Sequence, residues 1–203
     1  MIMNSLDVLL QKNSLFSKYR TWWADKAVRE CWGEFSDTLV GKRALEIGCG
    51  SGCGTAVIKK YFADVELTAT DLDPRLLAAA AAKLNDSSIT FAVADACRLE
   101  CADNEYDAIF DFGVIHHIAD WRACLRELRR ALKPDGTIFV VDSPIESFNT
   151  FLGRIVRTYA SHPYDEMFSE HEFVEYLGEL GFTTLVRHTY SPTLYYFVMV
   201  VRK

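Results

Sequence analysis

A glycine-rich segment at residues 46–54 constrains the fold of this 203-residue chain more than any other feature. It reads Glu-Ile-Gly-Cys-Gly-Ser-Gly-Cys-Gly, and it joins an apolar run at Arg43–Ile47 to a stretch with apolar residues at helical spacing, Val57–Phe62. Glycine permits sharp turns and the close approach of a ligand to the backbone. A strand, a glycine turn and a helix in this order predict a βαβ unit whose helix amino terminus points at a bound molecule.

Strand-like and helix-like segments alternate through the rest of the chain. Further strands are expected at the apolar runs 65–70, 89–93, 108–112 and 137–141. Helices are expected after the capping residues Asp73, Asp120 and Ser169, the last in a capping box with Glu172. The tetrapeptide Lys-Pro-Asp-Gly at 133–136 predicts a turn. This alternation is typical of a doubly wound α/β domain with a mostly parallel sheet.

We expect a single domain over residues 1–203 with four parts. Residues 1–40 have helical spacing and form a helical N-terminal cap, and residues 41–142 form the core that binds a cofactor. Residues 143–168 are irregular and aromatic, which favours a lid or an acceptor-binding segment. Residues 169–203 form a helix and two strands, at 182–189 and 194–201, whose short connection permits only antiparallel pairing.

Composition argues against several classes of function. The formal net charge of −6, from 22 basic and 28 acidic residues, disfavours an electrostatic grip on nucleic acid. The longest apolar run near either end, 195–201, is too short to span a membrane, although weak contact with a lipid-like substrate stays open. With no secretory signal at its start, the chain is expected to be cytoplasmic, as a monomer or a homodimer.

The six cysteines are expected to be free thiols that pack as small apolar groups. Two pairs, Cys49 with Cys53 and Cys97 with Cys101, have a spacing that invites a zinc interpretation. That spacing is loose, no histidine pair supports it, and the first pair lies inside the glycine turn. No metal site is therefore predicted from the sequence.

An acidic residue, Asp71, closes the second expected strand 23 residues after Gly48. A carboxylate at this position accepts hydrogen bonds from ribose hydroxyls in dinucleotide-binding folds. Nicotinamide binding is the competing interpretation, but its pyrophosphate pattern requires Gly or Ala where this chain has Cys53. The negative charge of Glu46 would also repel a pyrophosphate, whereas it would attract the cationic aminoacyl end of S-adenosylmethionine.

Four motifs in order resemble the class I S-adenosylmethionine-dependent methyltransferases, in particular the small-molecule group called the type 11 methyltransferase domain. They are ALEIGCGSG at 44–52, TATDLDP at 68–74, AVADACRL at 92–99, and FDFGVIHHIADW at 110–121, which leads into LKPDGTIFVVD at 132–142. The resemblance implies a seven-stranded sheet in the order 3-2-1-4-5-7-6, with strand 7 antiparallel and helices on both faces. It also implies S-adenosylmethionine as the cofactor and S-adenosylhomocysteine as its product.

The resemblance further implies roles for residues that would contact the cofactor. Gly48, Gly50 and Gly52 would form the floor under its methionyl and ribosyl parts, oriented by Glu46. Asp71 would hold the ribose and Leu72 would pack on the adenine. Asp95 and the backbone of Ala96 would bind the adenine edge, and the carbonyl of Phe112 would accept the ammonium group. Tyr19, on the N-terminal helix outside the resembling region, is a further candidate for the cofactor site. Both Asp71 and Asp95 have an alternative role as turn or helix caps.

The two histidines after the fourth strand, His116 and His117, are candidates for catalysis because they lie where methyl donor and acceptor should meet. Imidazole can serve as a general base near neutral pH, but the pair can also merely line the pocket. Candidates for binding the acceptor are Trp22, Arg154, Arg157 and Tyr159. Arg154 and Arg157 accompany an apolar stripe that is expected either to be buried as a cover helix or to form a lid over the acceptor.

The sequence therefore predicts a methyltransferase that moves a methyl group from S-adenosylmethionine to a small, partly apolar acceptor at O, N, S or C. Two alternatives remain at this point. One is an NAD-dependent oxidoreductase, and the other is a non-catalytic S-adenosylmethionine-binding protein with a regulatory or interaction role.

Overall fold

Seven strands of the computed structural model form one sheet, in the order β3-β2-β1-β4-β5-β7-β6. The structure describes residues 14–32, 35, 39–159, 162–190 and 195–203. Strand β7 runs antiparallel to both of its neighbours, whereas the pairs from β3 to β5 are parallel. The predicted fold class, strand order and reversed strand are confirmed.

Most of the strands lie close to the predicted runs, and β5 begins before its predicted start at residue 137. The strands are β1 Arg43–Ile47, β2 Glu66–Asp71, β3 Ile89–Val93, β4 Tyr106–Phe112, β5 Leu132–Asp142, β6 Thr183–Tyr190 and β7 Tyr196–Arg202. The α-helices are α2 Ser14–Ala27, α3 Cys53–Tyr61, α4 Pro74–Leu84, α5 Trp121–Ala131, α6 Ile145–Asn149, α7 Phe151–Tyr159 and α8 Glu170–Glu179. A π-helical segment, Val28–Trp32, continues α2, and a 3₁₀ turn, Ile115–His117, follows β4.

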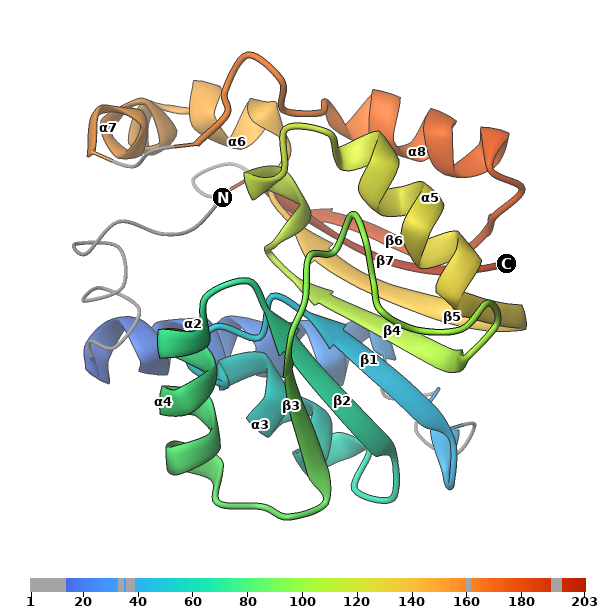
Figure 1. The fold of residues 1–203 in the computed structure, drawn as a ribbon. Coiled ribbons are helices and arrows are strands. Elements are labelled where there is room, and N and C mark those ends of the chain that lie inside the picture. Colours follow the sequence, from blue (N-terminus) through green and yellow to red (C-terminus); the bar gives the residue numbers. More distant parts are fainter. Residues whose placement is uncertain (1–13, 33–34, 36–38, 160–161, 191–194) are drawn as a thin grey trace.

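Helices cover both faces of the sheet, with α2, α3 and α4 on one face and α5 and α8 on the other (Figure 1). The central strands supply both cores by alternation, since successive side chains of a strand point to opposite faces. In β4, Phe110 and Phe112 belong to the core under α2 and α3, while Ile109 belongs to the core under α5. A strand buried on both faces explains why β4 and β5 read as nearly continuous apolar runs.

Local signals in the sequence set the helix ends. Asp73 and Asp120 accept hydrogen bonds from the backbone N–H groups of Arg75 and Ala123, and Ser169 forms the predicted capping box. Each cap satisfies N–H groups that a helix leaves free at its first turn. The helix caps predicted from the sequence are confirmed.

Two segments differ from the sequence-based expectation. Residues 133–136 lie inside β5 as an irregularity in its pairing with β4, because Leu132 already pairs with Tyr106 before the register shifts. Asp135 still has the positive φ of a turn residue, 62°. Residues 143–168 contain the helices α6 and α7, whereas irregular structure was predicted there.

The described helices include none with the length and apolar character that crossing a membrane would require. The part of the expected N-terminal helix before Ser14 lies outside the described residues. From Ser14 onward the predicted helical cap is present as α2.

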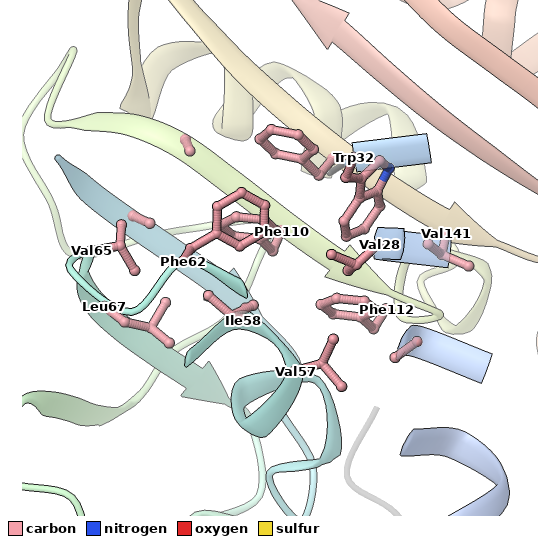
Figure 2. Close-up of a cluster of buried hydrophobic side chains, with 14 of the residues drawn as sticks. Val28, Trp32, Val57, Ile58, Phe62, Val65, Leu67, Phe110, Phe112 and Val141 are labelled. Atoms are coloured by element: carbon pink, nitrogen blue, oxygen red, sulfur yellow. The ribbon is translucent and has the colours of Figure 1, made fainter. Parts of the chain in front are cut away.

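Trp32 occupies the centre of the core beneath α2 and α3 (Figure 2). Its ring centroid lies 5.2 Å from those of Phe112 and Phe139 and 6.0 Å from that of Phe110. The side chain is fully buried, and no described residue accepts a hydrogen bond from its Nε1–H. Trp32 therefore contributes to the stability of the fold through apolar burial and ring contacts. The unsatisfied N–H donor reduces that contribution.

Replacing Trp32 with Ala should lower the free energy of unfolding by about 3–5 kcal/mol, the usual cost of removing a large buried aromatic side chain. Trp32→Phe should cost clearly less, because it keeps a ring in the cluster and removes the unsatisfied donor. Urea denaturation of the three proteins measures the difference. A loss with Ala no larger than the loss with Phe would contradict this account of the core.

Candidate functional site

The turn after β1 needs glycine at several positions for reasons that the structure makes explicit. Gly48, Gly50 and Gly52 have φ values of 55°, 54° and 79°, in the left-handed region that other residues rarely adopt. A Cβ on Gly48 would also collide with the side chain of Val114, and one on Gly52 would press on α4. The glycines thus let the turn pack tightly between the segment after β4 and the helix α4.

Asp71 at the carboxyl end of β2 holds this turn in place. Its Oδ2 accepts a hydrogen bond from the backbone N–H of Gly50 at 2.8 Å, and its Oδ1 accepts one from Asp73 at 2.8 Å. The side chain is half-buried, and burial raises the pKa of its carboxyl group while the two backbone donors lower it. A carboxylate fixed at the mouth of a glycine turn is suited to binding a pair of hydroxyl groups.

Glu46 lies beneath the glycine turn and is only 1% exposed. The Thr55 hydroxyl of α3 donates to its Oε2 at 2.6 Å, and a Cβ on Gly54 would collide with its Oε1. Burial raises the pKa of Glu46 to about 8, because a buried carboxylate loses its hydration. The positive charge of Arg20 acts in the opposite direction.

Arg20 on α2 reaches the position that was predicted for the ammonium group of the cofactor. Its Nη2 lies 3.5 Å from the carbonyl oxygen of Phe112 at the end of β4. Burial raises the pKa values of Glu46, Cys49 and Asp71, and the charge of Arg20 offsets part of that rise. A cationic group therefore already occupies this acidic region, and the groups around it are suited to a positively charged ligand.

Of the residues predicted to bind the adenine, Asp95 and Ala96 follow β3, and Leu72 follows β2. Asp95 is exposed, and its Oδ1 accepts a hydrogen bond from the backbone N–H of Cys97 at 2.9 Å, so it caps its own turn. Leu72 and Ala96 are half-buried. The backbone N–H of Ala94 donates to the carbonyl of Asp71, which ties this turn to the end of β2. Asp95 and Ala96 thus lie next to Asp71 along the same sheet edge.

His116 and His117 meet a third histidine, His162, from the loop between α7 and α8. The ring centroids of His116 and His117 are 4.0 Å apart, and that of His162 lies 4.4 Å from His117 and 5.3 Å from His116. Burial lowers the pKa of His117 well below its usual value, and neighbouring His116 and His162 lower it further. His117 is therefore neutral at physiological pH.

A buried carboxylate orients His116. Asp142 at the end of β5 is fully buried, and its Oδ1 contacts Nδ1 of His116 in a short hydrogen bond. The backbone N–H groups of His116 and Ser143 donate to the same carboxylate at 3.2 and 2.6 Å. Asp111 on β4 is also fully buried, and burial together with Asp142 raises its pKa well above the usual value. Asp142 is the hydrogen-bond partner that keeps the His116 ring in one orientation.

The predicted acceptor-binding residues are mostly exposed. Trp22 is 58% exposed, Arg154 is exposed, and the guanidinium of Arg157 lies 4.6 Å from the ring centroid of Tyr164. The apolar stripe of α7 is exposed as well, with Phe151 at 81%, so its interpretation as a buried cover helix was wrong. The side chains of Tyr19 and Tyr159 lie outside the described part of the chain.

Sequence reasoning missed Asp142. The signal that could have revealed it is the one used for Asp71, an acidic residue at the carboxyl end of a parallel strand. It also missed His162, because the contact of this residue with His116 and His117 joins positions about 45 residues apart in the chain.

Comparison with known proteins gives consistent results. A protein-family model described as a methyltransferase domain matches residues 45–140. The chain is 30% identical over 193 residues to phosphoethanolamine N-methyltransferase 3 of Arabidopsis thaliana, which covers 86% of this chain and 39% of that protein. It is 26% identical over 157 residues to a demethylmenaquinone methyltransferase of Thermotoga maritima, covering 77% of this chain and 68% of that protein. The chain spans only about two fifths of the first of these relatives.

Solved structures with the same fold include a SAM-dependent methyltransferase from Aquifex aeolicus, with a TM-score of 0.72 and 18% identity over 99% of both chains. A SAM-dependent methyltransferase from Methanosarcina mazei gives a TM-score of 0.66 at 19% identity and covers 80% of this chain and 92% of that one. At these identities the likeness concerns the fold. The match to the methyltransferase domain model and the similarity to curated methyltransferases imply S-adenosylmethionine as the cofactor. The residues at the edge of the sheet fit it: a carboxylate at the position predicted for the ribose, a glycine turn, and an acidic region that attracts a cation.

Replacing Asp71 with Ala should weaken the binding of S-adenosylhomocysteine at least tenfold. Two charge-assisted hydrogen bonds to ribose are worth about 1.5–3 kcal/mol each, and a tenfold change corresponds to about 1.4 kcal/mol. Calorimetric titration measures the dissociation constant, and Asp86→Ala in the exposed turn before β3 is the matched control. A change below about threefold in Asp71→Ala would remove this residue from the ribose site.

The affinity for S-adenosylhomocysteine should rise with pH between about pH 6 and pH 8. Glu46 is protonated below its pKa of about 8 in the free protein, whereas the ammonium group of the ligand favours the carboxylate. Binding therefore releases a proton, and the affinity gains at most about tenfold per pH unit before it levels off near pH 8.

Calorimetry over this pH range tests the effect, and buffers with different ionisation enthalpies count the released protons. Glu46→Gln should bind more weakly at pH 8 and with little dependence on pH, since the amide cannot ionise. An unchanged slope in Glu46→Gln would show that the proton comes from another group.

Proposed function

We propose that this chain, which belongs to the class I S-adenosylmethionine-dependent methyltransferase family, transfers a methyl group from S-adenosylmethionine to a small, partly apolar acceptor. The observation that carries the proposal is the convergence of two different sets of groups on one edge of the sheet. Asp71 and the glycine turn lie at the ends of β2 and β1, while His116 and its partner Asp142 lie just after β4 and at the end of β5. Ligands of open α/β sheets bind at this edge.

The cofactor binds on the β1–β2 side of the edge. Asp71 accepts the ribose hydroxyls, Leu72, Asp95 and Ala96 receive the adenine, and Glu46 with the Phe112 carbonyl attracts the ammonium group. Arg20 then has to leave its contact with Phe112 when the ammonium group arrives. The guanidinium that it carries is well suited to binding the carboxylate of the same methionyl group.

The acceptor binds on the β4–β5 side, against the three histidines and the aromatic residues around them. The ring of Phe148 lies 5.0 Å from that of His162 and 5.3 Å from that of Tyr164. Arg157 lies over the Tyr164 ring and supplies a positive charge at the border of this aromatic surface. These groups favour an acceptor with an apolar body and an anionic group.

Names of curated relatives are compatible with such an acceptor without specifying it. They include phosphoethanolamine N-methyltransferases, demethylmenaquinone methyltransferases and a fatty-acid O-methyltransferase of Mycolicibacterium smegmatis. The helices α6 and α7, from the segment 143–168, lie on the side of the carboxyl ends of the parallel strands (Figure 1). We assign them the role of a cover over the acceptor, which excludes water while the methyl group moves.

His116 activates the acceptor in this scheme. Asp142 accepts its Nδ1–H, so the lone pair is on Nε2, the ring nitrogen not engaged by the carboxylate. Methyl transfer from a sulfonium is a displacement in line with the carbon–sulfur bond, and it requires an unprotonated acceptor atom at close approach. The carbon–sulfur electron pair stays on sulfur, and the acceptor's proton leaves.

Replacing His116 with Ala should lower the rate of methyl transfer by roughly 100-fold, within the range for loss of an activating group, while the affinity for S-adenosylhomocysteine changes little. The assay incubates the protein with methyl-labelled S-adenosylmethionine and a cell extract and follows the labelled product. His188→Ala, an exposed histidine on β6, is the matched control.

Wild-type protein that binds S-adenosylhomocysteine yet labels no acceptor would favour the non-catalytic alternative. A His116→Ala protein with nearly full turnover would reduce the histidine to pocket lining and leave catalysis to the positioning of donor and acceptor.

A further inference from the structure

Three of the five histidines of the chain lie together, although they come from two distant segments. His116 and His117 belong to the 3₁₀ turn after β4, and His162 belongs to the loop that precedes α8. One ring nitrogen of each lies within 4.8 Å of those of the other two. Among the described residues, this is the one group of three histidine, cysteine or acidic side chains with a spacing that could hold a metal ion.

Second contacts orient two of these rings. The carboxylate of Asp142 binds Nδ1 of His116, and the hydroxyl of Tyr164 lies 3.2 Å from Nδ1 of His162. Asp142 is itself fixed by the backbone N–H groups of His116 and Ser143. Histidine ligands of metals typically donate their other ring nitrogen to a carboxylate in this way, which fixes the ring and leaves Nε2 free for the ion.

The ligand set selects the kind of ion. Three imidazoles without a carboxylate oxygen suit zinc and similar divalent transition metals, whereas magnesium and calcium require oxygen ligands. Three protein ligands also leave the fourth position of a tetrahedral ion open, as in catalytic rather than structural zinc sites.

The rings must move slightly to enclose an ion. Zinc–nitrogen bonds of about 2.0–2.1 Å place tetrahedral ligand atoms about 3.3 Å apart, which is closer than the 4.8 Å limit of the present cluster. His117 and His162 are now stacked at an interplanar angle of 19°, so at least one ring has to tilt. His162 can do so because it lies in a loop, whereas Asp142 holds His116 in place.

We propose that His116, His117 and His162 bind one divalent transition-metal ion, with zinc as the first candidate, and that the ion activates an oxygen or sulfur acceptor. This assignment rests on the proposed function for its catalytic part, and it specifies how His116 acts there. The acceptor coordinates through its heteroatom at the open position and gives its proton to water. The heteroatom then attacks the methyl carbon, and the carbon–sulfur pair stays on sulfur, so that S-adenosylhomocysteine is released.

Metal binding can be tested without any acceptor. Zinc chloride is titrated by calorimetry into the full chain, produced without a polyhistidine tag, and cobalt(II) is titrated by visible absorption. We expect one ion per chain and the visible absorption of four-coordinate cobalt. No thiolate-to-cobalt charge-transfer band should appear, because the proposed ligands are histidines. Such a band would show that one or more of the six cysteines bind the ion instead.

His162→Gln should weaken zinc binding at least tenfold, and Asp142→Asn should weaken it about 10–100-fold, the usual effect of losing an outer-shell partner. His171→Gln, an exposed histidine on α8, is the matched control and should bind like the wild type. His162→Gln changes a loop residue and leaves the buried residues of the sheet unchanged, so we expect this variant to fold, and thermal unfolding can verify it. It therefore keeps the test valid even if Asp142→Asn proves unstable. A thiolate band, a stoichiometry well below one, or unchanged affinity in His162→Gln would overturn the site.

The same preparations separate this proposal from the proposed function. Chelator treatment should abolish methyl transfer to the extract, and added zinc should restore it, while S-adenosylhomocysteine affinity stays unchanged. Full methyl transfer after verified removal of the metal would overturn the metal's role and leave the methyltransferase function intact. Stoichiometric zinc binding by a protein without affinity for S-adenosylhomocysteine would instead contradict the methyltransferase function and support the metal site alone.

Discussion

The two hydrogen bonds that Asp71 accepts from Gly50 and Asp73 join the turn after β1 to the turn after β2. Three positions of the glycine turn are glycines with positive φ, which have no side chains that could hold the turn. A carboxylate from the neighbouring strand supplies the missing constraint, and its position follows from the parallel pairing of β1 with β2. The shape of the cofactor side therefore depends on sheet register more than on loop sequence.

That dependence explains which features could be predicted from the sequence. Asp71, the glycines and the caps Asp73, Asp120 and Ser169 act on backbone groups close to them in the chain or one strand away, so residue type and spacing identify them. The order of the strands in the sheet could be predicted only from the resemblance to a known family. The alternation of strands and helices predicts the fold class, but it is compatible with several strand orders.

Contacts between distant segments could not be predicted in the same way. Arg20 lies 92 residues before Phe112, and Asp142 lies 26 residues after His116. Neither separation along the chain corresponds to the period of a helix or a strand. Each contact forms only when α2 or β5 is packed in the folded domain. The exposure of the apolar stripe of α7 is a similar case. The helical spacing of Leu152 and Ile155 predicts an apolar face of the helix, but it does not predict whether another element packs against that face.

Buried acidic groups give the site its electrostatic character. Glu46, Asp111 and Asp142 are buried at the ends of β1, β4 and β5, and burial raises the pKa values of Glu46 and Asp111. Burying a charge is costly unless it is paired, so such a group either keeps its proton or gains a cation. Arg20 meets this need near Glu46, and the ring of His116 contacts Asp142. A cationic ligand that replaces Arg20 therefore meets acidic groups that are already buried, and its charge favours the ionised form of Glu46. The acceptor side differs because histidines line it, and a neutral imidazole has a lone pair that can bind an electrophile or a proton.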